Sequence, residues 1–213
     1  KNKILNINYK IPNIVEILEN ETKITRKIIV KILSKIKNLE LIFNNPKEFL
    51  EEISKILKDQ MYQAKVDGIE YELTGEKYDM KEFKNEISSY ENKIVMIDNS
   101  IYDGIVWESE IEKRFAEGLD SKNMKMIKIL LKLPKWYKIK TPMGTYNPDW
   151  AVVRQNRDEK DMKFIVFETK GTKDEHALTP DEQRKIQCGK KYFKVIDDVT
   201  YDLAKEPDDI FKI

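Results

Sequence analysis

The 213-residue sequence contains one cysteine, Cys188, and one histidine, His176. A single cysteine excludes a disulfide within the chain and is usual in a reducing compartment, so we expect a cytoplasmic protein. A single histidine excludes zinc sites that need two histidines and argues against a nuclease of the His-Asn-His type. No uncharged apolar run is long enough to cross a bilayer and no secretory signal is visible, so we expect no membrane partner.

The sequence also lacks a Gly-x-x-x-x-Gly-Lys-[Ser/Thr] phosphate loop, so we do not expect this chain to bind ATP by that route. Basic and acidic residues nearly balance, 39 against 38, and the net charge is +1. A nucleic-acid surface would therefore have to be a local patch. The length suffices for one large domain or two small ones. Because the sequence begins at Lys1 without a methionine, we expect it to be a fragment of a longer protein.

Two short β-type runs, WAVV and FIVF, lie within residues 146–171, joined by the polar segment 155–163. This pattern predicts a pair of adjacent antiparallel strands. Asp149 stands directly before the first run, and Glu168 directly after the second. The hairpin would bring these carboxylates together, which repulsion disfavours unless they surround a hard cation. Lys170 would add positive charge for a phosphate; the alternative is that all three residues form an exposed strand end and a turn.

Pro148-Asp149 and Glu168-Thr169-Lys170 resemble the motif of PD-(D/E)XK nucleases. The surrounding segments LLKLPKWYKIKTPMGTYNPDWAVV, FIVFETKGT and EQRKIQCGKKYFKV resemble the C-terminal endonuclease region of the Res subunit of type III restriction enzymes. This likeness is nearly continuous over residues 107–195. Upstream, ITRKIIVKIL and FNNPKEFLEEI resemble the segment that precedes this nuclease region.

The resemblance implies an α/β fold, with a PD-(D/E)XK restriction-endonuclease-like core over residues 104–213. This core would have a mixed central sheet flanked by helices, and a mostly helical connecting region, residues 1–103, would precede it. The implied activity is Mg²⁺-dependent hydrolysis of double-stranded DNA. The implied partners are the Mod methyltransferase subunit and a helicase-type motor domain of the same full-length chain, which would supply ATP hydrolysis.

The resemblance also implies roles for particular residues. Asp149, Glu168 and Lys170 would be catalytic. Asp149, Glu168 and the backbone carbonyl of Thr169 would hold Mg²⁺, for which Mn²⁺ could substitute because oxygen ligands suit both ions. Glu112 follows Ser109 in a Ser-x-x-Glu pattern, so it is either a helix-capping carboxylate or a further metal ligand from the helix before the sheet.

Four residues are candidates for DNA binding. Lys185 and Gln183 lie on the helix expected after the catalytic strand, which crosses the active site in similar nucleases. Lys138 and Lys140 alternate with aromatic or apolar residues, as on a strand that faces DNA phosphates. The alternatives are a solvated helix face for the first pair and a strand edge protected by lysines for the second.

Apolar periodicity predicts the remaining elements. The expected helices cover residues 25–36, 46–61, 81–87, 109–119 and 180–191, the last one capped by Thr179. The expected strands cover residues 1–11, 69–73, 93–96, 124–133, 135–140 and 192–196, in addition to the two strands of the hairpin.

Two further hypotheses remain open from the sequence. The chain could be a nuclease of the same fold that acts in DNA repair or in another defence system. It could also be a DNA-binding or scaffold domain whose nuclease core no longer cuts. Metal binding at Asp149 and Glu168 would distinguish the enzymes from the scaffold.

Overall fold

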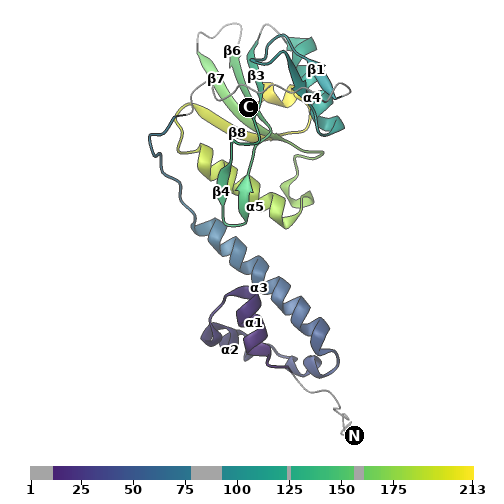
Figure 1. Ribbon diagram of the computed structural model, residues 1–213, viewed down its shortest axis with the longest axis vertical. Helices are drawn as coiled ribbons and strands as arrows, with labels where there is room; N and C mark the ends of the chain where they lie inside the picture. The colour runs from purple at the N-terminus through teal and green to yellow at the C-terminus, as the bar shows by residue number, and fades with distance from the viewer. Residues whose placement is uncertain (1–11, 78–92, 124–125, 156–160) are drawn as a thin grey trace. The chain divides into compact units, whose positions relative to one another are not determined.

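The computed structural model describes residues 12–77, 93–123, 126–155 and 161–213 (Figure 1). The strand predicted at 1–11 and the helix predicted at 81–87 lie outside these residues. The chain divides into two compact units, with the boundary between Asp67 and Gly68. The boundary predicted between residues 103 and 104 stays a prediction.

The first unit is helical in its described part. Its elements are α1 (Ile14–Thr22), α2 (Arg26–Leu33), the 3-10 helix η1 (Leu39–Phe43) and α3 (Pro46–Gly68). The helices predicted at 25–36 and 46–61 are confirmed, and α3 runs further than expected. Asn45 caps α3, because its Oδ1 accepts the backbone N–H of Glu48 at 3.3 Å. The apolar stripes of the three α-helices meet in one core, formed by Leu18, Ile29, Leu33, Leu50, Ile53 and Leu57.

A mixed four-stranded sheet forms the centre of the second unit, in the order β3-β6-β7-β8. Its strands are β3 (Ile127–Lys132), β6 (Trp150–Gln155), β7 (Met162–Thr169) and β8 (Val199–Ala204). Strand β6 is antiparallel to β3 and β7, whereas β8 is parallel to β7. The predicted hairpin and the predicted mixed sheet are therefore confirmed.

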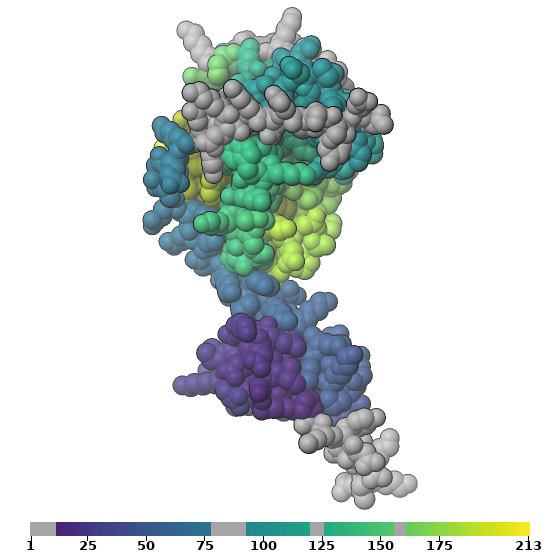
Figure 2. Space-filling model, viewed as in Figure 1, coloured from purple at the N-terminus to yellow at the C-terminus, as the bar shows by residue number. Residues whose placement is uncertain are grey.

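Smaller elements surround this sheet in the second unit. They are the antiparallel pair β1 (Ile94–Met96) and β2 (Gly104–Val106), helix α4 (Glu110–Asn123), the antiparallel pair β4 (Ile139–Thr141) and β5 (Gly144–Tyr146), the 3-10 helix η3 (Glu175–Ala177), helix α5 (Pro180–Phe193) and the 3-10 helix η4 (Pro207–Phe211). In the space-filling view the green residues of β4 and β5 lie beside the yellow-green helix α5, with which β4 is in contact (Figure 2).

Helices cover both faces of the sheet, as its alternating side chains require. Phe167 of β7 contacts Phe115 of α4, with ring centroids 5.0 Å apart. The adjacent residue Val166 points to the opposite face and shares a core with Phe193 of α5. From Ile165 onward both faces of β7 are therefore buried, which explains why the run stays apolar there.

The last strand was predicted wrongly at residues 192–196. Tyr192 and Phe193 end α5, and the backbone N–H of Lys194 still bonds to Lys190 at 3.2 Å. A turn follows, in which Asp198 adopts a left-handed φ of 62° before β8 begins at Val199. A short apolar run does not separate a helix end from a strand, and here packing against the sheet decides for the helix.

Two other predicted strands need correction. Residues 69–73 form no regular element, although the Tyr71 hydroxyl donates to the Lys140 carbonyl at 2.8 Å. Of the strand predicted at 135–140, only residues from Ile139 onward pair, in β4. The turn after Pro134, whose carbonyl accepts the Tyr137 N–H at 2.9 Å, keeps the preceding residues out of the ladder. No helix in the described part of the chain combines the length and the apolarity of a membrane span.

Gly118 lets α4 approach η4 closely. A Cβ atom added at this position would collide with the ring of Pro207. Because a proline ring has little freedom to move, the collision should outweigh the better helix propensity of alanine. We expect Gly118→Ala to lower the free energy of unfolding of the second unit by about 1–2 kcal/mol.

Urea denaturation followed by tryptophan fluorescence measures this effect, since all three tryptophans, Trp107, Trp136 and Trp150, belong to the second unit. Glu117→Ala is the matched control, because Glu117 is exposed on the same helix. It should change the free energy by less than about 0.5 kcal/mol. Equal effects of the two substitutions would contradict the close packing of α4 on η4.

Candidate active site

The candidate site lies where the β6–β7 hairpin ends. Trp150 pairs with Phe167 in the antiparallel register, so the next residues outward, Asp149 and Glu168, stand at the same level. Strand β3 adds a further constraint, because the backbone N–H of Leu133 donates to the Asp149 carbonyl at 2.8 Å. The fold thus brings together the two carboxylates that the sequence predicted as a pair.

The Asp149 side chain is fixed by Thr169. The backbone N–H and the Oγ1 hydroxyl of Thr169 both donate to Asp149 Oδ2, at 2.8 and 2.6 Å. Both donors fall on one oxygen, so Oδ1 is the carboxylate oxygen that can turn toward a cation. The N–H and C=O of an extended residue point to the same side of its strand. The Thr169 carbonyl therefore faces the Asp149 side of β7, as its predicted role requires.

Glu168 is almost completely buried, with 7% of its surface exposed. Its Oε2 atom accepts the Tyr146 hydroxyl at 2.8 Å, and its Oε1 atom lies 3.1 Å from the Lys170 ammonium. A buried carboxylate needs such partners, because an unpaired charge inside a protein is costly. Tyr146 and Lys170 together fix which way each oxygen of Glu168 faces.

Lys170 is held between two carboxylates. Besides Glu168, its Nζ atom contacts Oε1 of Glu182 at 3.3 Å. Glu182 belongs to a capping box at the start of α5, in which it accepts the backbone N–H and the hydroxyl of Thr179 at 3.1 and 2.7 Å. The cap predicted at Thr179 is confirmed, and the same carboxylate that caps α5 also positions Lys170.

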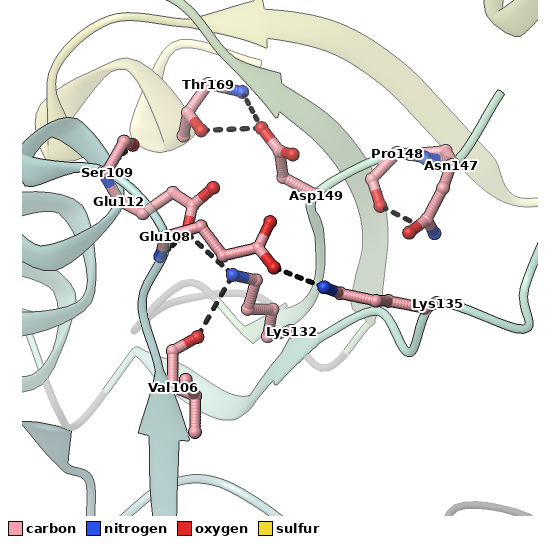
Figure 3. A network of polar contacts seen from close by, with 10 residues as sticks. All are labelled: Val106, Glu108, Ser109, Glu112, Lys132, Lys135, Asn147, Pro148, Asp149 and Thr169. Carbon is pink, nitrogen blue, oxygen red and sulfur yellow. Dashed lines mark hydrogen bonds and ion pairs between the residues drawn. The ribbon is translucent and has the colours of Figure 1, made fainter. Parts of the chain in front are cut away.

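Glu112 reaches the same region from α4 (Figure 3). Its Oε2 atom accepts the backbone N–H of Glu108 at 2.8 Å and the Lys132 ammonium at 2.6 Å. Lys132, at the end of β3, also donates to the Val106 carbonyl at 3.0 Å. The Ser109 hydroxyl accepts the backbone N–H of Glu112 at 3.2 Å, so Ser109 caps α4 as predicted, whereas the Glu112 carboxylate accepts the N–H of Glu108 rather than that of Ser109. Its role as a metal ligand stays a prediction.

Burial and mutual repulsion alter the protonation of this site. Burial, together with the negative charge of Asp149, raises the pKa of Glu168 to about 7. Burial also raises the pKa of Asp149, although the hydrogen bonds from Thr169 act in the opposite direction. Burial would lower the pKa of Lys170, but the adjacent Glu168 carboxylate raises it overall. A raised pKa favours the ammonium form of Lys170 at neutral pH.

The donor set suits a hard divalent cation. Two carboxylates and a carbonyl offer only oxygen atoms, which Mg²⁺ and Mn²⁺ prefer. The raised pKa of Glu168 fits such an ion, because a cation would relieve the repulsion from Asp149. Among the described residues, no three acidic, histidine or cysteine side chains already form a metal cluster. Glu112, the predicted third acid, is instead paired with Lys132.

Two of the four residues predicted to bind DNA, Gln183 and Lys185, lie on α5, and the other two lie just before and within β4. Gln183 donates its amide to the Leu178 carbonyl at 2.9 Å, which supports the loop before α5. Lys185 is partly exposed on that helix. Lys138 and Lys140 are exposed on either side of the buried Ile139, as the alternation predicts. Contact of these residues with DNA stays a prediction.

Sequence reasoning missed the residues that support the pair. Tyr146, Glu182 and Lys132 contact Glu168, Lys170 and Glu112, respectively. Only Glu182 carries a local signal, the Thr-x-x-Glu pattern of a capping box. The other two come from separate strands, and no spacing in the sequence links them to their partners.

A mixed α/β domain with paired carboxylates and a lysine at a hairpin end is consistent with a restriction-endonuclease-like domain. Comparison with protein families supports this class, because a family model described as an endonuclease domain matches residues 98–207, just over half of the chain. The chain therefore belongs to this family of restriction-type endonuclease domains. Asp149, Glu168 and Lys170 all fall within the matched range. Searches of curated proteins and of solved structures found no match.

The raised pKa of Glu168 predicts a pH-dependent stability. Its folded pKa of about 7 exceeds the ordinary value of 4.5, so the folded protein holds this proton more tightly than the unfolded chain. Without metal, Glu168 should lower the free energy of unfolding as the pH rises between these two values. Glu168→Gln removes this loss, so the variant should gain up to about 3 kcal/mol over the wild type across that range.

Urea denaturation with a chelator, from about pH 4 to about pH 8, measures the difference. Added Mg²⁺ should then stabilise the wild type more than the variant, because glutamine lacks the charge that the cation would balance. A difference between the two proteins that does not vary with pH would show that Glu168 titrates normally.

Proposed function

We propose that this chain is a Mg²⁺-dependent endonuclease module that hydrolyses phosphodiester bonds of double-stranded DNA. The observation that carries the proposal is the carboxylate pair of half-buried Asp149 and buried Glu168, with the Lys170 ammonium 3.1 Å from Glu168. A structural ion pair would need one acid and one base. The second acid leaves negative charge that a divalent cation can balance. Membership in the endonuclease family supports the same reaction class.

The residues of the site have separate tasks in this reaction. Asp149 Oδ1, Glu168 Oε1 and the Thr169 carbonyl would hold the cation, which supplies positive charge to the scissile phosphate and acidifies water. Lys170 keeps its proton, so it can donate to a phosphate oxygen as negative charge develops there. Glu182 and Glu168 hold the Lys170 ammonium from two sides, which reduces the reorganisation needed during the reaction.

We further propose that the module is part of the Res subunit of a type III restriction-modification system. The support is the likeness of residues 107–195 to the endonuclease region of that subunit. In such an assembly the Mod subunit recognises the DNA sequence, and a motor domain elsewhere in the full-length chain hydrolyses ATP. The described part of this chain would then supply the cutting site alone.

Nicking of supercoiled plasmid tests the proposed reaction. The wild-type chain should nick DNA with Mg²⁺ or Mn²⁺ and should not nick it with a chelator. Lys170→Ala should fold normally and lose at least about 100-fold in rate, the usual effect of removing one group that stabilises transition-state charge. The assay is made on the chain alone and in the full complex with Mod and ATP.

Lys163→Ala is the matched control, because Lys163 is exposed at the opposite end of the same strand. It should cut like the wild type. Cutting that persists with a chelator, or an undiminished rate in Lys170→Ala, would contradict the proposed site. Absence of cutting even in the full complex would instead favour a scaffold domain that no longer cuts.

A further inference from the structure

Two tyrosines form a hydrogen-bonded chain that ends at Oε2 of Glu168, whereas Lys170 contacts the other oxygen, Oε1. The Tyr146 hydroxyl, from β5, lies 2.8 Å from Glu168 Oε2 and 2.6 Å from the Tyr201 hydroxyl of β8. The two rings are perpendicular, with centroids 6.5 Å apart. Gly189 of α5 leaves room for them, because a Cβ there would lie 2.8 Å from Tyr201 Cζ and 3.1 Å from Tyr146 Cε1.

The number of available protons fixes the direction of this chain of hydrogen bonds. A tyrosine hydroxyl has one proton to donate, and an ionised carboxylate only accepts. When Glu168 is ionised, as it would be with a cation bound, the Tyr146 hydroxyl therefore donates a hydrogen bond to Glu168, and Tyr201 must donate to the Tyr146 oxygen. Tyr201 is itself fixed, because its ring stacks on Phe193 at a centroid distance of 5.3 Å and an interplanar angle of 8°. The donor to Glu168 thus stands on a rigid support.

Each carboxylate of the pair has one oxygen engaged by a neutral donor. Thr169 engages Oδ2 of Asp149, and Tyr146 engages Oε2 of Glu168. The other oxygens, Oδ1 and Oε1, remain for a cation. Lys170 also lies on Glu168 Oε1, but a carboxylate oxygen has two acceptor positions and can serve both.

We propose that Tyr146, supported by Tyr201, restricts Glu168 to binding a cation through one oxygen and thereby makes the site prefer Mg²⁺ to Ca²⁺. Mg²⁺ requires a near-ideal octahedron, which single-oxygen ligands provide. Ca²⁺ takes six to eight oxygen ligands and often binds both oxygens of a carboxylate. This inference rests on the proposed function, since it requires a cation at Asp149 and Glu168.

Calorimetric titration of the whole chain with Mg²⁺ and, separately, with Ca²⁺ tests the inference without measuring cleavage. Tyr146→Phe keeps the ring but frees Oε2 of Glu168. The ratio of Ca²⁺ affinity to Mg²⁺ affinity should rise roughly tenfold, the lower end of the effect of removing a partner of a metal ligand. Gly189→Ala pushes on both rings and should change the ratio in the same direction.

Two variants serve as controls, and tryptophan fluorescence verifies folding of every protein. In Tyr201→Phe the Tyr146 hydroxyl still donates to Glu168, so this variant should change the ratio of Ca²⁺ to Mg²⁺ affinity less than Tyr146→Phe does. Tyr192→Phe removes a hydroxyl from another part of the same apolar cluster and should leave the ratio unchanged.

The possible failures are distinguishable. If the folded Tyr146→Phe and Gly189→Ala proteins keep the wild-type ratio, the tyrosines do not set the preference, and the cation site itself stands. If the wild type binds neither ion, and Mn²⁺ does not bind either, both the proposed cation site and the role of Tyr146 are wrong.

Discussion

Repulsion between two adjacent carboxylates, one buried and one half-buried, is the constraint on which this structure depends. Asp149 and Glu168 approach because the β6–β7 register places them opposite each other at the end of the hairpin. The surrounding chain compensates from three directions: Thr169 on Asp149, and Lys170 and Tyr146 on Glu168. Burial, together with the charge of Asp149, still raises the pKa of Glu168 to about 7. Such a conflict at a strand end marks a candidate functional site, and the proposed cation would balance its negative charge.

The support of the site links all layers of the second unit. Glu182 belongs to α5, Lys132 to β3 and Tyr201 to β8, so the ends of several elements meet around one hairpin. A close approach at Gly189 brings α5 onto Tyr201 of β8, and one at Gly118 brings α4 onto η4. The positions of the candidate catalytic side chains therefore depend on the packing of the entire unit rather than on one loop.

The sequence alone predicted the hairpin and its acidic pair, because strand periodicity and chain direction are local properties. The order of the predicted elements, together with the family resemblance, predicted the mixed sheet and the helices that flank it. It failed at residues 192–196, where a short apolar run ends a helix instead of forming a strand. It also could not find Tyr146 behind Glu168, since the contact spans 22 residues and depends on how β5 packs against the sheet.

The location of a bound cation decides whether Asp149 and Glu168 form a metal site. Crystals of the chain containing Mn²⁺ would give an anomalous scattering peak at each bound ion. The proposed cation site predicts a peak about 2 Å from one oxygen of Asp149, one oxygen of Glu168 and the Thr169 carbonyl. Mn²⁺ bound only at other positions, with the Lys170 ammonium still paired with Oε1 of Glu168, would contradict the proposed site.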